Sequence, residues 1–330
     1  MHRWLLAATA FVLGAGLLIS RVSEIAASEQ LETHSLAQTG LSVESSVYAP
    51  GVRPGSDSST PPVPADFDAQ INGWIASLSA QDRFNDWNGA AWTRYPLGAG
   101  MHGWLILLRK DGSEVGYLVV GAAEDGSLKL VEYGAGENPL FSMKTLYRSL
   151  IQGELIRSDI TDTSAIPPIS VERLYYSPLH AVWKAVLDGQ SIYIDAVTGE
   201  QLPLSDAVFE PLQPYRPNDS LASPASRMRQ SSVQAPFDPY DNTYWITDSP
   251  MPVAGARELL ADLHSAESPV LYKANLYGKK VLAPFAVTGY HDWGPSGLYV
   301  GLEQQGARYV PFDVLPEHGT FHRQRASVSP

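Results

Sequence analysis

The stretch HAVWKAVLDGQSIYIDAVTGEQL, residues 180–202, decides the fold of this chain. On each side of Asp188-Gly189, apolar residues recur at every second position, a period typical of strands that bury one face. Asp-Gly tolerates the positive φ angles that a tight hairpin turn needs. A second turn is expected at Thr198-Gly199. The stretch therefore predicts an antiparallel β-hairpin that is closed by a further turn.

The same turn chemistry occurs earlier, in WLILLRKDGSEVGYLVVGAAEDGSLKLVEYG, residues 104–134. Asp-Gly interrupts the apolar runs at 111 and 112 and again at 125 and 126. Two such interruptions divide the segment into three runs of strand length. We expect a three-stranded antiparallel meander here.

Two amphipathic helices are predicted beside these strands. Behind Asp66, which can cap a helix, apolar residues recur at helical spacing; they are Phe67, Ile71, Trp74, Ile75 and Leu78. In the second helix Ser142 is the expected N-cap and Gly153 the expected end. The first half of the chain is therefore predicted to be α+β, an antiparallel sheet with packed helices.

A later part of the chain has its own pattern. One helix is predicted near Pro252, with an apolar stripe formed by Ala256, Leu259, Leu260 and Leu263. Short β-rich runs punctuated by Gly and Pro follow it. These runs favour a small β-rich C-terminal module, either a strongly bent sheet or a partial barrel.

Composition divides the chain into five parts. Segments dense in Pro, Ser and Gly have too little apolar surface to offset the entropy of ordering, so they are predicted to be disordered. The expected parts are a signal peptide or membrane anchor (1–28), a stalk (29–65), an α+β domain (66–205), a disordered linker (206–242) and a β-rich domain (243–323).

The N-terminus predicts export. MHR precedes an apolar run of 17 residues, 4–20, and Arg21 follows it. The run is at the lower limit for spanning a bilayer, and Ile25-Ala26-Ala27-Ser28 offers small residues that a signal peptidase accepts. Two outcomes stay open: a single-pass transmembrane helix in the cell membrane, or a cleaved signal and a secreted protein. Both place the remainder outside the cytoplasm.

Composition also excludes several functions. A formal net charge of −12 offers no basic surface for a phosphate backbone, so nucleic acid is not an expected partner. The chain has no cysteine, which excludes disulfides, thiolate metal sites and a thiol nucleophile. The 44% hydrophobic content is sufficient for folded cores.

Residues 183–202 resemble the closing hairpin of a PepSY domain, a peptidase propeptide-type module. The residues that carry this structural motif are Asp188, Gly189, Asp195, Thr198 and Gly199. The resemblance implies a non-catalytic, extracytoplasmic, protein-binding module, with a peptidase or cell-wall enzyme as the partner that it restrains. By its own chemistry Asp195 can accept backbone N–H groups of the turn, and Gly199 can take the left-handed conformation.

Histidines near the C-terminus offer a different function. His291, His318 and His322 lie near Asp292 and Glu317 in the sequence, and histidines with carboxylates can bind zinc or perform acid–base chemistry. However, Gly and Pro around His318 disfavour a helical pair of ligands. No metal or cofactor is therefore expected, and a metal-assisted hydrolase is the alternative to a protein-binding module.

An aromatic cluster precedes the predicted meander. It consists of Trp87, Trp92, Tyr95 and Trp104. Such residues form partner surfaces as well as cores, so they are the candidate partner surface. No nucleophile elbow or paired carboxylates accompany them, and the protein is predicted not to be an enzyme.

Overall fold

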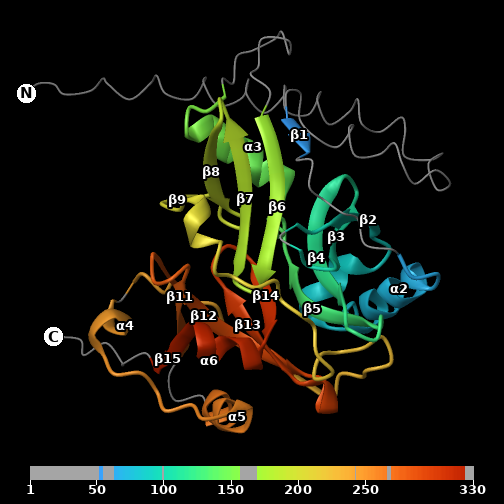
Figure 1. The fold of residues 1–330 in the computed structure, drawn as a ribbon. Helices are drawn as coiled ribbons and strands as arrows, with labels where there is room; N and C mark the ends of the chain where they lie inside the picture. The colour runs from blue at the N-terminus through green and yellow to red at the C-terminus, as the bar shows by residue number, and fades with distance from the viewer. Residues whose placement is uncertain are drawn as a thin grey trace, which may run out of the picture. The chain divides into compact units, whose positions relative to one another are not determined.

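Two sheets built largely from tight hairpins organise the chain in the computed structural model (Figure 1). The structure describes residues 52–54, 63–98, 100–156, 169–241, 243–265 and 269–323. Helices accompany both sheets (Figure 1). The chain is therefore a mixed α+β protein, as the sequence predicts.

The larger sheet has ten strands, and strands from both halves of the chain contribute to it. Nine follow the order β15-β11-β12-β13-β14-β5-β4-β3-β2, and β10 pairs with β12 off this path. These strands are β2 (Ala91–Pro96), β3 (Gly103–Lys110), β4 (Ser113–Ala122), β5 (Leu128–Ala135), β10 (Gln230–Val233), β11 (Val270–Leu276), β12 (Val281–Asp292), β13 (Leu298–Glu303), β14 (Ala307–Pro311) and β15 (Gly319–Arg323).

The smaller sheet has five strands in the order β1-β6-β7-β8-β9 and contains the hairpin of residues 180–202. Its strands are β1 (Val52–Pro54), β6 (Ile169–Ser177), β7 (His180–Leu187), β8 (Gln190–Asp195) and β9 (Gln201–Leu202). Strand β1 runs parallel to β6, and the other pairs are antiparallel.

Helices connect and cover these strands. The α-helices are α2 (Phe67–Leu78), α3 (Met143–Gln152), α4 (Tyr244–Thr247), α5 (Ala256–Ser265) and α6 (Leu315–His318). The 3-10 helices are η1 (Asp82–Trp87), η3 (Asp206–Val208), η4 (Gly294–Ser296) and η5 (Phe312–Val314).

Two of the three Asp-Gly dipeptides form the predicted turn with positive φ at both residues, whereas at 125 and 126 only Gly126 has a positive φ. Asp188 and Gly189 have φ angles of 51° and 77°, and Leu187 pairs with Gln190 across the two-residue loop. Positive φ at both central positions is the turn that matches the twist of a hairpin. The dipeptide at 111 and 112 repeats this conformation between β3 and β4, with φ angles of 51° and 80°. Local sequence therefore determines both hairpins.

Helices α2 and α3 occupy the predicted positions. The predicted stripe of α2 is buried, and Phe67 meets Trp104 of β3 with ring centroids 5.1 Å apart. The expected cap at Asp66 is wrong, because its side chain makes no capping hydrogen bond. Ser142 does cap α3, since its Oγ accepts from the backbone N–H of Thr145 at 3.4 Å.

The sequence predicts two separate domains, whereas in the structure both halves of the chain contribute strands to one sheet. Instead of a separate bent sheet or partial barrel, the C-terminal strands continue the first sheet, because β14 pairs with β5. The expected linker contributes β10 to that sheet and buries Leu221 and Ala222, and Ala222 bridges Leu130. The Pro-rich composition of this segment predicts disorder, but a few apolar residues in it are enough to hold it against the sheet.

The predicted transmembrane helix needs correction. Within the residues that the structure describes, no helix is long and apolar enough to cross a bilayer. The apolar run at 4–20, on which that prediction rested, lies outside the described residues, as does most of the expected stalk.

Candidate functional site

The turn that closes the hairpin of residues 180–202 is held by the interactions that its sequence predicts. Asp195 Oδ1 accepts from the backbone N–H groups of Val197 and Thr198, at 2.9 and 2.7 Å. Gly199 has a φ of 75°, in the left-handed region. Ser149 Oγ of α3 donates to the Gly199 carbonyl at 2.5 Å. The turn is therefore fixed both internally and against a helix.

This turn lines one of three hollows that meet at the β13–β14 turn, residues 303–306. The first hollow has a volume of about 630 Å³ and lies among residues 198–200, 236–240 and 303–305. The second, of about 360 Å³, lies on the η1 and β4 side of the same turn. The third, of about 10 Å³, shares lining residues with both. We call the three together the β13–β14 groove.

The β13–β14 groove is acidic. Two arginines line it, and both are already paired: Arg83 bonds Glu303 at 2.9 Å, and Arg308 bonds the buried Glu132. No lysine is among the lining residues. The carboxylates in its lining are Asp86, Glu114, Glu137, Glu200, Asp238 and Glu303.

A buried ion pair lies beneath the groove within the larger sheet, and Tyr175 of β6 reaches it from the smaller sheet. Glu132 of β5 is 0% exposed, and both its carboxylate oxygens accept from one terminal nitrogen of Arg308 at 3.0 Å. The hydroxyl groups of Tyr117 and Tyr175 donate to the same carboxylate at 2.8 and 3.0 Å. Burial, followed by the charge of Glu132, raises the pKa of both tyrosines well above the usual value, so both remain donors.

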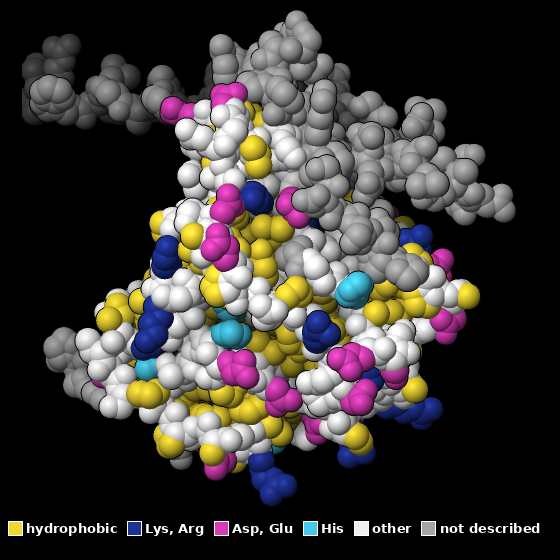
Figure 2. All heavy atoms as spheres, in the orientation of Figure 1, with side chains coloured by type: hydrophobic (Ala, Val, Ile, Leu, Met, Phe, Trp, Pro, Cys, Tyr) yellow, Lys and Arg dark blue, Asp and Glu magenta, His cyan; other side chains and the backbone are white. Residues whose placement is uncertain are grey.

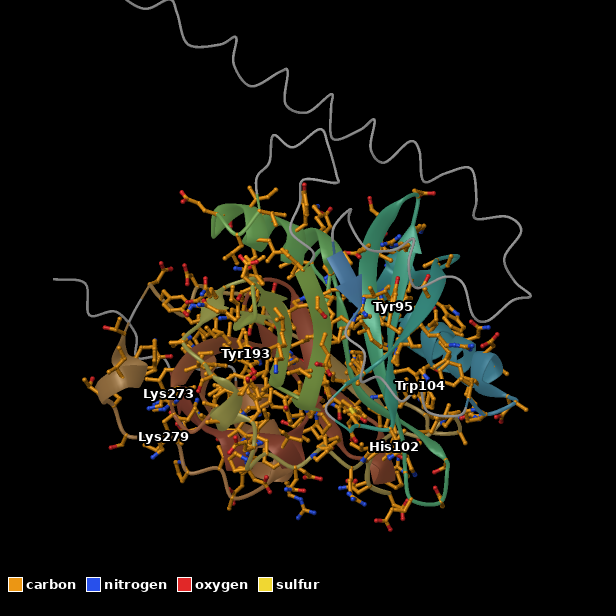
Figure 3. The ribbon with its side chains drawn as sticks, turned by 45° about the horizontal axis from the view of Figure 1, so that its top comes forward. Tyr95, His102, Trp104, Tyr193, Lys273 and Lys279 are labelled. Atoms are coloured by element: carbon orange, nitrogen blue, oxygen red, sulfur yellow. The ribbon has the colours of Figure 1, made fainter. Side chains whose placement is uncertain are left out.

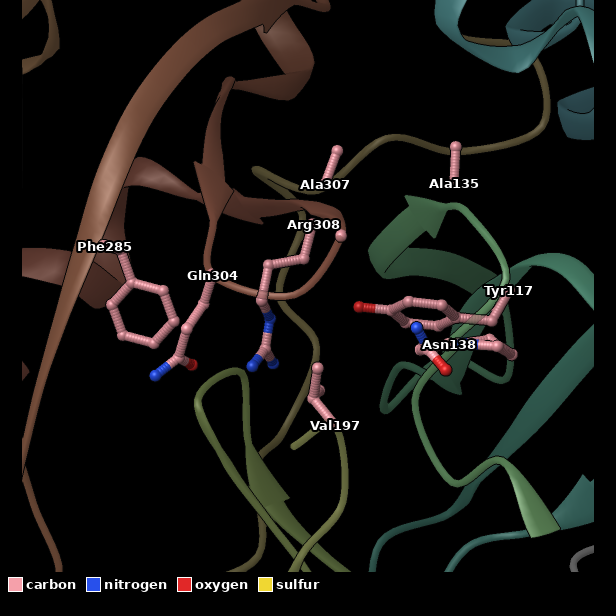
Figure 4. A pocket seen from close by; sticks show the side chains of 10 residues that line it. Tyr117, Ala135, Asn138, Val197, Phe285, Gln304, Ala307 and Arg308 are labelled. Carbon is pink, nitrogen blue, oxygen red and sulfur yellow. The ribbon is translucent and has the colours of Figure 1, made fainter. Parts of the chain in front are cut away.

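One hydrogen-bond donor of this network is unused. Arg308 is 8% exposed, and within the described chain its buried Nε–H has no acceptor. The side chain lies between Gln304 and Tyr117 in the small third hollow (Figure 4). A hollow of this size holds about one water-sized atom. The site therefore presents one N–H group to one small acceptor.

The three predicted metal candidates have different neighbours. His291 is 1% exposed, bonds the Tyr133 hydroxyl at 2.8 Å and stacks on Tyr309 with centroids 4.0 Å apart. Burial, assisted by Arg83, lowers the pKa of His291 to about 3, so the ring is a neutral core residue. Its role is packing, and the mixed sequence around it, with Tyr290 on one side and Asp292 on the other, does not reveal this.

His318 and His322 have other surroundings. His318 packs edge-on against His180 with ring centroids 4.5 Å apart, whereas His322 Nε2 lies 2.9 Å from Thr320 Oγ1. The histidines visible in Figure 2 lie apart on the face drawn there. No group of three or more His, Cys, Asp or Glu residues suited to a metal ion occurs in the described part of the chain. The geometry gives the metal-assisted hydrolase no support.

Ser177 and His180 form a contact that resembles a catalytic dyad, with Oγ and Nδ1 2.9 Å apart. His180 Nε2 accepts from the Tyr277 backbone N–H at 3.5 Å, so the ring proton is on Nδ1 and donates to Ser177. The Ser177 hydroxyl in turn donates to the Pro178 carbonyl at 3.1 Å. Because the histidine donates to the serine, this contact stabilises the β6–β7 turn and does not activate a nucleophile.

The predicted aromatic partner surface is mostly core, which corrects that prediction. Trp87, Tyr95 and Trp104 are 1%, 5% and 1% exposed, and Tyr95 and Trp104 lie among the strands of the first half (Figure 3). Trp92 is partly exposed, and its Nε1 donates to Asn72 at 3.0 Å. Trp104 also lines a separate hollow of about 560 Å³.

The groove and the ion pair beneath it are not apparent from motifs or spacing in the sequence. A signal for Glu132 exists, because this one acidic residue interrupts the apolar run LKLVEYGA of β5. The groove has no such signal, since its walls come from segments far apart in the chain. No protein-family model, curated protein or solved structure matches the chain.

Proposed function

We propose that this chain is an exported, non-catalytic protein whose PepSY-like module binds a peptidase or cell-wall enzyme outside the cytoplasm and restrains it. The β13–β14 groove is the binding site in this proposal. The observation that carries it is that the closing turn of the PepSY-like hairpin, residues 198–200, lines the largest of the three hollows. The apolar run after MHR at the N-terminus supports export.

The groove has properties suited to a protein partner. Its largest hollow, at about 630 Å³, is wide enough for several side chains, and Tyr240 on its wall is 57% exposed. Exposed tyrosines are frequent among residues that contribute strongly to protein binding. The turn beside Tyr240 is fixed by Asp195 and Ser149, so little conformational entropy is lost on binding.

Site-specific photo-crosslinking tests this function. A photoreactive amino acid replaces Gln305, which is exposed in the groove, or Arg257, which is exposed on α5 and outside the groove. We expect a crosslinked species of defined mass from position 305 and not from 257. The purified partner should be a peptidase or cell-wall hydrolase whose activity falls when the chain is added.

The contrary result is equally clear. Crosslinks of equal yield from both positions, or a partner whose activity does not change, would refute the proposal.

A further inference from the structure

The buried Nε–H of Arg308 is the observation that points to a ligand. An unsatisfied donor that is out of contact with water costs free energy, so native structures almost always provide it with an acceptor. Arg308 is 8% exposed, and its position is already fixed by Glu132. The small hollow that Arg308 lines gives an acceptor a route to this side chain (Figure 4).

The surroundings restrict what that acceptor is. The hollow has a volume of about 10 Å³ and admits a single oxygen atom. Of the six carboxylates in the groove, Glu114 and Glu303 are paired with arginines, and the other four disfavour an anionic oxygen nearby. A neutral carbonyl oxygen meets both requirements. The carbonyl of a peptide backbone is such a group, and it comes with side chains that can enter the hollows on either side.

The two larger hollows favour cationic side chains. Glu200 and Asp238 line the first hollow, and Asp86 and Glu137 line the second. None of these four carboxylates has an ion pair with a lysine or arginine in the part of the chain that the structure describes. All four residues are exposed, so lysine or arginine side chains of a partner can reach carboxylates that are not neutralised.

We propose that the β13–β14 groove binds an extended, cationic segment of the partner protein, an inference that rests on the proposed function. One backbone carbonyl of the segment accepts from Arg308 Nε in the small hollow. Lysine or arginine side chains on either side of it reach Glu200 and Asp238 in one direction and Asp86 and Glu137 in the other.

Fluorescence anisotropy with a labelled Lys-Gly-Lys-Gly-Lys-Gly-Lys-Gly peptide tests the charge requirement on the whole chain. We expect saturable binding that weakens between 50 and 300 mM salt, and no binding of the matching Glu-Gly peptide. The double substitution Glu200→Gln with Asp238→Asn should raise the Kd about tenfold or more. Its matched control is Glu124→Gln with Asp219→Asn, which makes the same charge change at two exposed sites outside the groove.

The hydrogen bond of Arg308 has its own measurement. The ¹⁵N NMR signal of Arg308 Nε should move when the Lys-Gly peptide is added and stay in place with free lysine at equal charge. An unmoved signal, or a control pair that weakens binding as much as the groove pair, would overturn the inference. If crosslinking at Gln305 instead identifies a partner whose crosslinked segment is not cationic, this inference fails while the proposed function stands.

Discussion

Acid should destabilise this protein through its buried neutral histidines. Burial, with the nearby His318 and Arg308, lowers the pKa of His180 to about 3, and burial also lowers the pKa of His291 to about 3. Both have a pKa near 6.5 in the unfolded chain. As the pH falls below 6.5, the unfolded chain therefore binds protons that the folded protein does not. Stability is complete above pH 6.5 and is lost progressively toward pH 3.

The size of the loss follows from the linkage slope, which is about 1.4 kcal/mol per pH unit for one proton. Between pH 6.5 and 5, each buried histidine therefore removes about 2 kcal/mol, and the two together about 4 kcal/mol. His318 and His322 act in the same direction, because burial lowers the pKa of each. This is a large part of the stability of an ordinary domain.

Urea unfolding followed by tryptophan fluorescence at pH 7 and pH 5 measures this loss. His180→Gln removes one titrating group, so the variant should lose about 2 kcal/mol less than the original chain between the two pH values. His102→Gln is the matched control, because the His102 side chain is exposed. If His180→Gln loses as much stability as the original chain, the explanation by buried neutral histidines is refuted.

Three substitutions test interactions that stabilise the fold. Glu132→Gln leaves Arg308 charged and buried, so it should lower the free energy of unfolding by about 3–5 kcal/mol. Adding Arg308→Met should restore most of this loss. A loss below about 1 kcal/mol in urea titrations would contradict the buried pair. Asp195→Ala removes two hydrogen bonds of the closing turn, so it should lower the free energy of unfolding by about 1–3 kcal/mol and speed amide exchange at Val197 and Thr198. Unchanged exchange would contradict these two hydrogen bonds. Trp104→Ala should cost about 3–5 kcal/mol in the same titrations, and a neutral result would place Trp104 on the surface.

Local features of this fold are predictable from the sequence. Asp188-Gly189 specifies its hairpin because few other dipeptides accept positive φ at two successive positions. The stripe from Phe67 to Leu78 specifies α2, and Ser142 specifies the start of α3. The interactions of Asp195 and Gly199 follow from the chemistry of these two residues. In each case the cause lies within a few positions of its effect.

Long-range features could not be predicted in the same way. Nothing near Ala135 in the sequence indicates that Ala307 pairs with it. This pairing puts the meander and the C-terminal strands, which were expected in separate domains, into one sheet. His291 is bounded by residues that look equally suited to a surface and to a core, and its burial follows from Tyr133 and Tyr309 arriving from other strands. The walls of the groove come from more than three segments far apart in the chain, so the turn at 198–200 is predictable from its own residues while the groove that it lines is not.

The pairing of β5 with β14 has a consequence for the synthesis of the chain. Glu132 and Arg308 are separated by 176 positions, and a ribosome needs roughly 9–35 s to add that many residues. Until β14 is made, the edge of β5 at residues 133–135 has no partner strand, because Ala222 covers only Leu130, and an unpaired apolar strand edge is prone to pair with another chain. A nascent chain that stalls before residue 307 would keep that edge and would be a template for aggregation. The protein should therefore depend on a chaperone most strongly in the interval just before its last strands emerge.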